Sequence, residues 1–212
     1  MAHIAEIGSR IELVSMDNHF HDISLGLYEQ AGEDGIPEFL VHSYADIKGT
    51  AERVRFVMRA MQNLGGMETT LAGRLRFNCR DGHVTACRRL FLEASKVVPN
   101  VIPEARPMTV HDRKTDFDYS VTSCGSGVYR VTARCDGDVI TRRVKVIAGG
   151  LRKLGDMAES KNEDEVQFSC GAAHDSLIGM LLVRAPNVRA VIREQDSSAK
   201  QGVLTAPSAQ SV

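Results

Sequence analysis

Two stretches of this sequence, "RFNCRDGHVTACRRLFLEA" (residues 76–94) and "QFSCGAAHDSLIGMLLVRA" (residues 167–185), share one pattern of side chains. Phenylalanine, cysteine and histidine are rare here, at 7, 5 and 7 copies, so a second Phe-x-Cys-x-x-x-His is informative. Similar segments at a fixed spacing indicate a duplicated structural unit. The shared positions, each 91 residues apart, are Phe77 and Phe168, Cys79 and Cys170, His83 and His174, Leu90 and Leu181, and Ala94 and Ala185.

The segments around these stretches predict the same elements twice. Alternating residues predict strands at 10–17, 21–30, 37–45 and 74–79, with helices at 50–66 and from 83. The second copy predicts strands at 108–113, 118–124, 129–135 and 165–170, with helices at 141–154 and from 175. We therefore predict an α/β fold of the two-layer α+β class, a tandem duplication of a β-β-β-α-β-α unit. The expected units are residues 1–99 and 107–195, followed by a flexible polar tail at 196–212.

Composition excludes several classes of protein. The chain has 26 basic and 27 acidic residues, so no basic excess favours nucleic acid or an anionic membrane as a partner. No apolar run approaches the roughly 18–20 residues that cross a bilayer, and the first residues lack the apolar core of a signal peptide. Five cysteines without an export signal are expected to be reduced thiols in the cytoplasm. We also expect a homo-oligomer, because half-open sheets commonly complete their burial by symmetric assembly.

The repeated cysteine and histidine stand where a strand meets a helix in each copy. Pseudo-twofold packing of the copies would bring Cys79, His83, Cys170 and His174 together, and two thiolates with two imidazoles suit tetrahedral zinc. A second interpretation is an active site, in which Cys170 and His174 act as nucleophile or acid/base, since a helix N-terminus lowers the pKa of a thiol. A third is structural, with cysteines as small buried hydrophobes and histidines as helix caps. The sequence leaves all three open.

Three further groups of residues are candidates for function. His21, with His19, would project from one face of an extended segment and assist catalysis. Gly171 and Asp175 lie at a helix start with small neighbours, where backbone N–H groups can bind a phosphate or carboxylate of a substrate or cofactor. The basic pairs are predicted to be solvated helix faces; they are Arg88 with Arg89 and Arg142 with Arg143.

The duplicated unit resembles the imidazoleglycerol-phosphate dehydratase family. The resemblance is carried by a helix ending "QNLGG", a strand and the helix "GHVTACRRLFLEA", and again by "AAHDSLIGMLLVRA". It implies the two-half fold and, as an activity, a metal-dependent lyase. In that family the second helix of each half opens with His-His-x-x-Glu. The matching positions here hold Gly82, His83 and Ala86 in the first unit, or His83, Val84 and Cys87 if the match is shifted by one residue. In the second unit they hold His174, Asp175 and Ile178. A second resemblance, through "HFHDISL" and "APNV", to formaldehyde-activating enzymes implies a one-carbon function.

Two functions of different classes follow from these observations. In the first, the chain is a cytosolic enzyme with lyase-like chemistry on a small anionic metabolite, bound between the repeats or between subunits. In the second, it is a non-catalytic homo-oligomeric module for ligand binding or assembly, whose Cys/His corners are structural.

Overall fold

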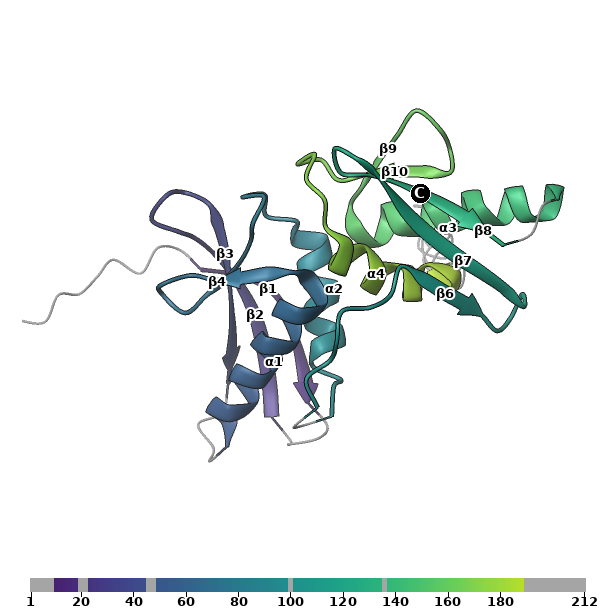
Figure 1. The fold of residues 1–212 in the computed structure, drawn as a ribbon. Coiled ribbons are helices and arrows are strands. Elements are labelled where there is room, and N and C mark those ends of the chain that lie inside the picture. Colours follow the sequence, from purple (N-terminus) through teal and green to yellow (C-terminus); the bar gives the residue numbers. More distant parts are fainter. Residues whose placement is uncertain (1–9, 19–22, 45–48, 99–100, 135–136, 189–212) are drawn as a thin grey trace, which may run out of the picture.

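The computed structural model describes residues 10–18, 23–44, 49–98, 101–134 and 137–188, which form two halves with the same order of elements (Figure 1). The first half contains β1 (Ile11–Asn18), β2 (Ile23–Ala31), β3 (Pro37–Ser43), α1 (Thr50–Gly65), β4 (Met67–Thr69), β5 (Leu75–Phe77) and α2 (Val84–Ala94). The second half contains β6 (Thr109–Asp112), β7 (Phe117–Gly125), β8 (Val128–Ala133), α3 (Asp138–Gly155), β9 (Ala158–Glu159), β10 (Glu165–Gln167), α4 (Asp175–Arg184) and the 3-10 helix η1 (Ala185–Asn187).

Each half builds one antiparallel sheet of five strands with the same topology. The strand orders are β1-β2-β3-β5-β4 and β6-β7-β8-β10-β9. The third strand meets the fifth at equivalent places, where Phe39 pairs with Leu75 and Tyr129 pairs with Val166. The predicted duplication and fold class are therefore confirmed. Each half has one strand more than predicted, because β4 and β9, at 3 and 2 residues, are too short to show an alternating pattern.

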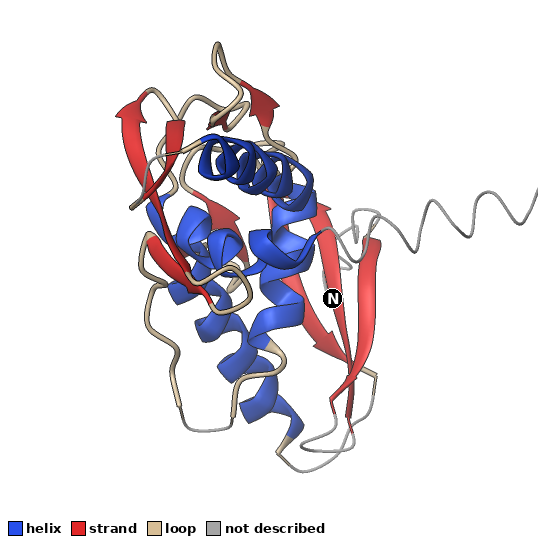
Figure 2. Cartoon of the chain, turned by 90° about the vertical axis from the view of Figure 1, so that its right-hand side faces the viewer, coloured by secondary structure: helices blue, strands red, loops and turns tan. Residues whose placement is uncertain are grey.

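The helices lie in the middle of the molecule and the sheets flank them (Figures 1 and 2). Helix α1 places Val57, Ala60, Met61 and Leu64 on one buried face, which is the spacing that an amphipathic helix needs. The halves meet through contacts of α1 with α4 and of α2 with α3, and one apolar core extends through both of them. Among the described helices, none has both the length and the apolar character to span a membrane.

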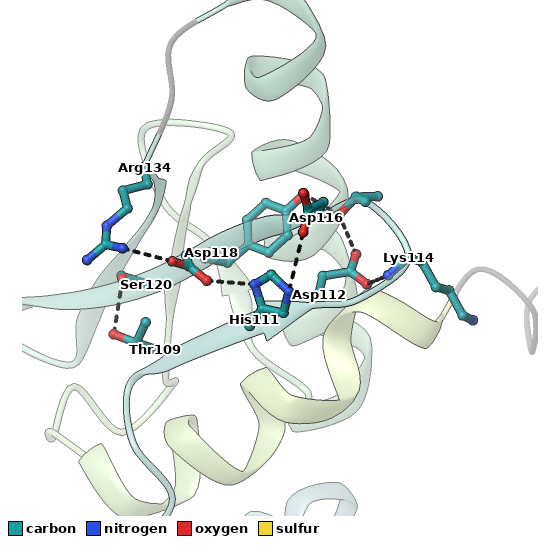
Figure 3. A network of polar contacts seen from close by, with 10 residues as sticks. Thr109, His111, Asp112, Lys114, Asp116, Asp118, Ser120 and Arg134 are labelled. Atoms are coloured by element: carbon teal, nitrogen blue, oxygen red, sulfur yellow. Dashed lines mark hydrogen bonds and ion pairs between the residues drawn. The ribbon is translucent and has the colours of Figure 1, made fainter.

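The solvent-exposed sides of the first three strands carry different polar networks in the two halves. In the first half, Glu12 accepts hydrogen bonds from the hydroxyls of Tyr28 and Tyr44 at 3.0 and 2.6 Å. In the second half, the carboxylate of Asp118 lies 2.9 Å from His111 Nδ1 and accepts a 3.1 Å bond from Arg134 (Figure 3). The duplicated sheets have thus diverged on these sides. Self-association through them stays a prediction.

Candidate metal site

The four repeated cysteines and histidines lie together where the halves meet. Cys79 follows β5 and His83 precedes α2, while Cys170 follows β10 and His174 precedes α4. One ligand atom from each of the four side chains lies within 4.8 Å of all the others. Within each half, the cysteine sulfur is 3.1 or 3.2 Å from Nε2 of its histidine. The two Cys-x-x-x-His segments thus form one cluster with equal contributions from both halves.

Aromatic rings surround the two imidazoles. The rings of His83 and His174 contact each other edge-on with centroids 4.8 Å apart. Phe77 packs edge-on against both histidines, at 5.1 and 5.9 Å, and Phe168 does the same at 5.4 and 4.9 Å. The repeated phenylalanines therefore position the histidines of both halves, which is why the whole Phe-x-Cys-x-x-x-His pattern recurs.

Burial keeps the two imidazoles neutral. His83 and His174 are only 9% and 8% exposed. Burial lowers the pKa of His83, and burial together with the nearby His83 lowers the pKa of His174 to about 4. Neutral imidazoles keep a ring nitrogen lone pair free, and that lone pair is what a metal ion requires.

The histidines do not act as helix caps, so that part of the structural interpretation was wrong. Both occupy the N-cap position, yet neither side chain bonds to a backbone N–H of its helix. At α4, the backbone N–H of His174 donates to the hydroxyl of Tyr129, which in turn donates to Asp175 at 2.8 Å. Asp175 therefore helps to hold the helix start through Tyr129, while the imidazole remains directed at the cluster.

Each cysteine sulfur accepts a backbone hydrogen bond from the residue two positions later. The N–H groups of Asp81 and Ala172 lie 3.4 Å from the sulfurs of Cys79 and Cys170. The intervening residues, Arg80 and Gly171, both adopt left-handed conformations, with φ of 66° and 68°. These turns direct the N–H groups toward the sulfur, where they favour a thiolate. Gly171, predicted to bind an anionic group, shapes this corner.

The left-handed turn predicts a small change in stability for one substitution and a clear loss for another. Arg80→Gly is expected to change the free energy of unfolding by less than about 1 kcal/mol, because relief of strain offsets the added freedom of the unfolded chain. Gly171→Ala is expected to destabilise the protein by about 1–2 kcal/mol, since nothing lies within 4 Å of the new Cβ and only the backbone conformation opposes it. Urea unfolding of both variants checks this. A larger loss in Arg80→Gly would mean that the arginine side chain itself stabilises the corner.

Gly127, in the β7–β8 hairpin, lies against the backbone of the Cys170 corner. A Cβ there would meet the carbonyl oxygen of Ala172 at 2.7 Å and the carbonyl carbon of Gly171 at 2.8 Å, and φ is +68°. We expect Gly127→Ala to lower the free energy of unfolding by about 2–3 kcal/mol, through backbone strain and overpacking. The control is Gly125→Ala in the same hairpin, where φ is +87° and nothing lies within 4 Å. Equal losses in the two variants, measured by urea unfolding, would show that the contact contributes nothing.

A solvent-open cavity of about 250 Å³ adjoins the cluster on one side. Cys79, His174 and Asp175 reach it, whereas Gly171 is not among its lining residues; the others are Gly65, Gly66, Asn78, Ala172, Ala173 and Ser176. On the pseudosymmetric side, Ser169 and Asp81 occupy the positions of Asn78 and Ala172. There the hydroxyl of Ser169 donates to Asp81 at 3.0 Å. Of the two cysteines, Cys79 thus lines this cavity.

Cys79 is not an activated nucleophile in the metal-free chain. Burial and, to a smaller extent, the adjacent Cys170 raise the pKa of its thiol to about 11, although the backbone N–H of Asp81 acts to lower it. The expectation that the helix N-terminus would lower a thiol pKa was wrong for this cysteine, because burial outweighs it. A bound cation would reverse the balance, since a thiol that coordinates a metal ion is deprotonated.

Other predicted residues have separate places. His19 and His21 lie outside the described residues. Arg88, Arg89 and Arg142 are exposed on their helices, as predicted. Arg143 is not: its side chain is 17% exposed and donates to Asp112 at 2.9 Å, so the prediction of a solvated face was wrong there.

Two polar groups of the second half were not predicted from the sequence. One is the chain from the His174 backbone through Tyr129 to Asp175. The other is the set around Asp112, which accepts a bond from the N–H of Lys114 (Figure 3). Asp112 also accepts a bond from the hydroxyl of Thr115. Only the short "HDRKT" turn between two strands could have pointed to the second group.

No family model, curated protein or solved structure matches the chain.

Proposed function

We propose that the chain binds one Zn²⁺ ion through Cys79, His83, Cys170 and His174, and that the ion joins the two halves. The observation that carries this proposal is the approach of four ligand atoms, two from each half, to within 4.8 Å of one another. In the part of the chain that the structure describes, no other group of three or more such side chains converges in this way.

The donor set and its dimensions support zinc. Zinc binds sulfur at about 2.3 Å and imidazole nitrogen at about 2.0–2.1 Å in a tetrahedron, which places ligand atoms about 3.3–3.8 Å apart. The sulfur–nitrogen distances of 3.1 and 3.2 Å within each half are already close to this range. Two sulfur and two nitrogen donors in a tetrahedron favour zinc over magnesium or calcium, which prefer oxygen ligands.

Four protein ligands point to a structural role for the metal. Structural zinc sites are closed by four side chains, whereas catalytic sites keep one position for water or substrate. The ligands here come in equal numbers from segments 91 residues apart, so binding would connect the two halves across the core. Because an unfolded chain has no preformed site, the free energy of metal binding then stabilises the folded state.

Cobalt substitution tests the site directly. Metal-free protein titrated with Co²⁺ is expected to develop thiolate charge-transfer bands and the visible bands of a tetrahedral ion, saturating at one equivalent, which zinc then displaces. Cys79→Ser and Cys170→Ser are each expected to weaken binding by at least about 100-fold, since each removes a direct ligand. Cys124→Ser, which changes an exposed thiol, is the control and should leave the titration unchanged. Spectra without thiolate bands, or unaltered in the ligand variants, would overturn the proposal.

A second candidate, an enzyme acting on a small anionic metabolite, is supported by the open cavity beside Cys79 and His174. Its polar lining includes Asn78, which follows β5, and Asp175 and Ser176 at the start of α4. Phosphate and short carboxylates are suitable probes, and their binding would shift the backbone amide resonances of Gly66 and Ser176. No shift at millimolar concentrations would count against this function. The resemblance to imidazoleglycerol-phosphate dehydratase, with its lyase activity, stays a prediction.

A further inference from the structure

The two thiols of the cluster come from opposite halves and are close enough to react with each other. The sulfurs of Cys79 and Cys170 lie within 4.8 Å, and a disulfide would bring them to about 2.05 Å. Cys87 is fully buried in the core, and Cys124 is exposed on β7, so neither belongs to this group. The packing that brings the four ligands together therefore also places a thiol of the first half beside a thiol of the second half.

Cys79 and Cys170 are both half-buried, and they differ in their relation to the cavity beside the cluster. Cys79 lines this solvent-open cavity of about 250 Å³, which is large enough for a peroxide molecule, and Cys170 is not among its lining residues. Ala172 also lines this cavity. The equivalent residue of the first half is Asp81, which accepts a hydrogen bond from the hydroxyl of Ser169. An oxidant that enters the cavity therefore meets Cys79 rather than Cys170.

We propose that Cys79 and Cys170 are a peroxide-sensitive pair, and that their oxidation to a disulfide between the halves releases the bound zinc. This regulation rests on the zinc site proposed above. The metal-bound thiolate of Cys79 attacks one oxygen of a hydroperoxide, the O–O bond breaks, and the leaving oxygen takes a proton to become water or an alcohol. The product is a sulfenic acid at Cys79.

The second step closes the disulfide. The thiolate of Cys170 attacks the sulfur of the sulfenic acid, the S–O bond breaks, and the hydroxide takes a proton to leave as water. The peroxide is reduced by two electrons and the two thiolates are oxidised by two. Only His83 and His174 then remain as ligands. Two neutral imidazoles hold zinc far more weakly than the full set, so the ion leaves while the covalent bond keeps the halves joined.

The test compares zinc-loaded and metal-free protein after treatment with hydrogen peroxide. Released zinc is measured with a chromogenic chelator, and disulfides are located by peptide mass spectrometry without reduction. We expect one zinc released for each Cys79–Cys170 disulfide, with recovery of binding after reduction by dithiothreitol. Cys124→Ser should behave as the parent protein does, which keeps an exposed thiol from confusing the count.

Two single variants separate the roles of the thiols. Both variants are labelled with zinc in excess of their weakened dissociation constants, so that the remaining thiolate stays bound to the metal. With Cys170→Ser, peroxide is then expected to leave a sulfenic acid at Cys79 that dimedone traps. With Cys79→Ser, labelling of Cys170 should be at least tenfold slower, because Cys79 alone of the two lines the cavity. Equal labelling rates would overturn the assigned order of attack.

The metal-free arm separates this inference from the zinc site itself. The protein could form the Cys79–Cys170 disulfide and yet never bind zinc. That result would support the peroxide-sensitive pair of thiols but overturn the proposal that its oxidation releases zinc. Zinc that binds but leaves under peroxide without this disulfide would overturn the inference and leave the zinc site standing.

Discussion

Removal of zinc is expected to lower the free energy of unfolding by about 4 kcal/mol, when free zinc at 1,000 times the dissociation constant is replaced by excess chelator. The effect is large because the proposed ion binds only the folded state, where segments of both halves meet. Urea unfolding with zinc and with chelator measures it. Both halves should lose stability in one transition, because α1 contacts α4 and α2 contacts α3 in a shared core.

The control for this prediction removes the thiols instead of the metal. A Cys79→Ser, Cys170→Ser double variant is expected to unfold at the same urea concentration with and without chelator. Cys124→Ser should keep the full response to zinc. A chelator effect of less than about 1 kcal/mol on the parent protein would contradict a structural role for the ion, even if zinc binds.

The repeated pattern predicted both the fold and the cluster because it records packing in each half. Phe77 and Phe168 contact both histidines, so the duplicated phenylalanine, cysteine and histidine depend on one another in space. Such a pattern is visible in a single sequence since chance rarely reproduces three uncommon residues at one spacing. The longer strands and the helices were predicted from the periodicity of their apolar residues, which also reflects packing. Strands β4 and β9 were too short to show such a periodicity.

The hydrogen-bond partners of polar side chains could not be predicted, because they depend on residues that differ between the two halves. Arg53 in α1 and Arg143 in α3 occupy equivalent positions in their helices. The buried Arg53 donates to the carbonyl oxygens of Ser95 and Val97, at 2.8 and 3.1 Å, whereas Arg143 bonds to a carboxylate. Arg53 thus donates to carbonyl oxygens that follow the end of α2, whereas Arg143 links α3 to a strand of its sheet. The helical pattern did not predict the direction of Arg143, because its partner Asp112 comes from a distant segment.

The pair of Asp112 and Arg143 is a buried ion pair in the second half. Their side chains are 4% and 17% exposed, and the distance between them is 2.9 Å. Burial opposes ionisation of Asp112, but Arg143, the hydroxyl of Thr115 and the N–H of Lys114 together keep its pKa below the usual value. Asp112 ends β6 and Arg143 lies in α3, so the pair fixes a helix to the edge of its sheet.

Asp112→Asn is expected to lower the free energy of unfolding by about 3 kcal/mol at pH 7, because it leaves Arg143 without its buried counterion. The pKa of Asp112 is lowered on folding, so its contribution is complete above the unfolded value of about 3.9 and decreases as the pH falls through the folded value. The difference between parent and variant should therefore narrow below about pH 4. Urea unfolding at pH 7 and pH 3 measures both effects.

The control is Asp116→Asn, in the same turn, where the side chain is 95% exposed; its free energy of unfolding should change little. A loss of less than about 1 kcal/mol in Asp112→Asn, or a difference that does not depend on pH, would mean that the packing of α3 holds the sheet edge without this charge.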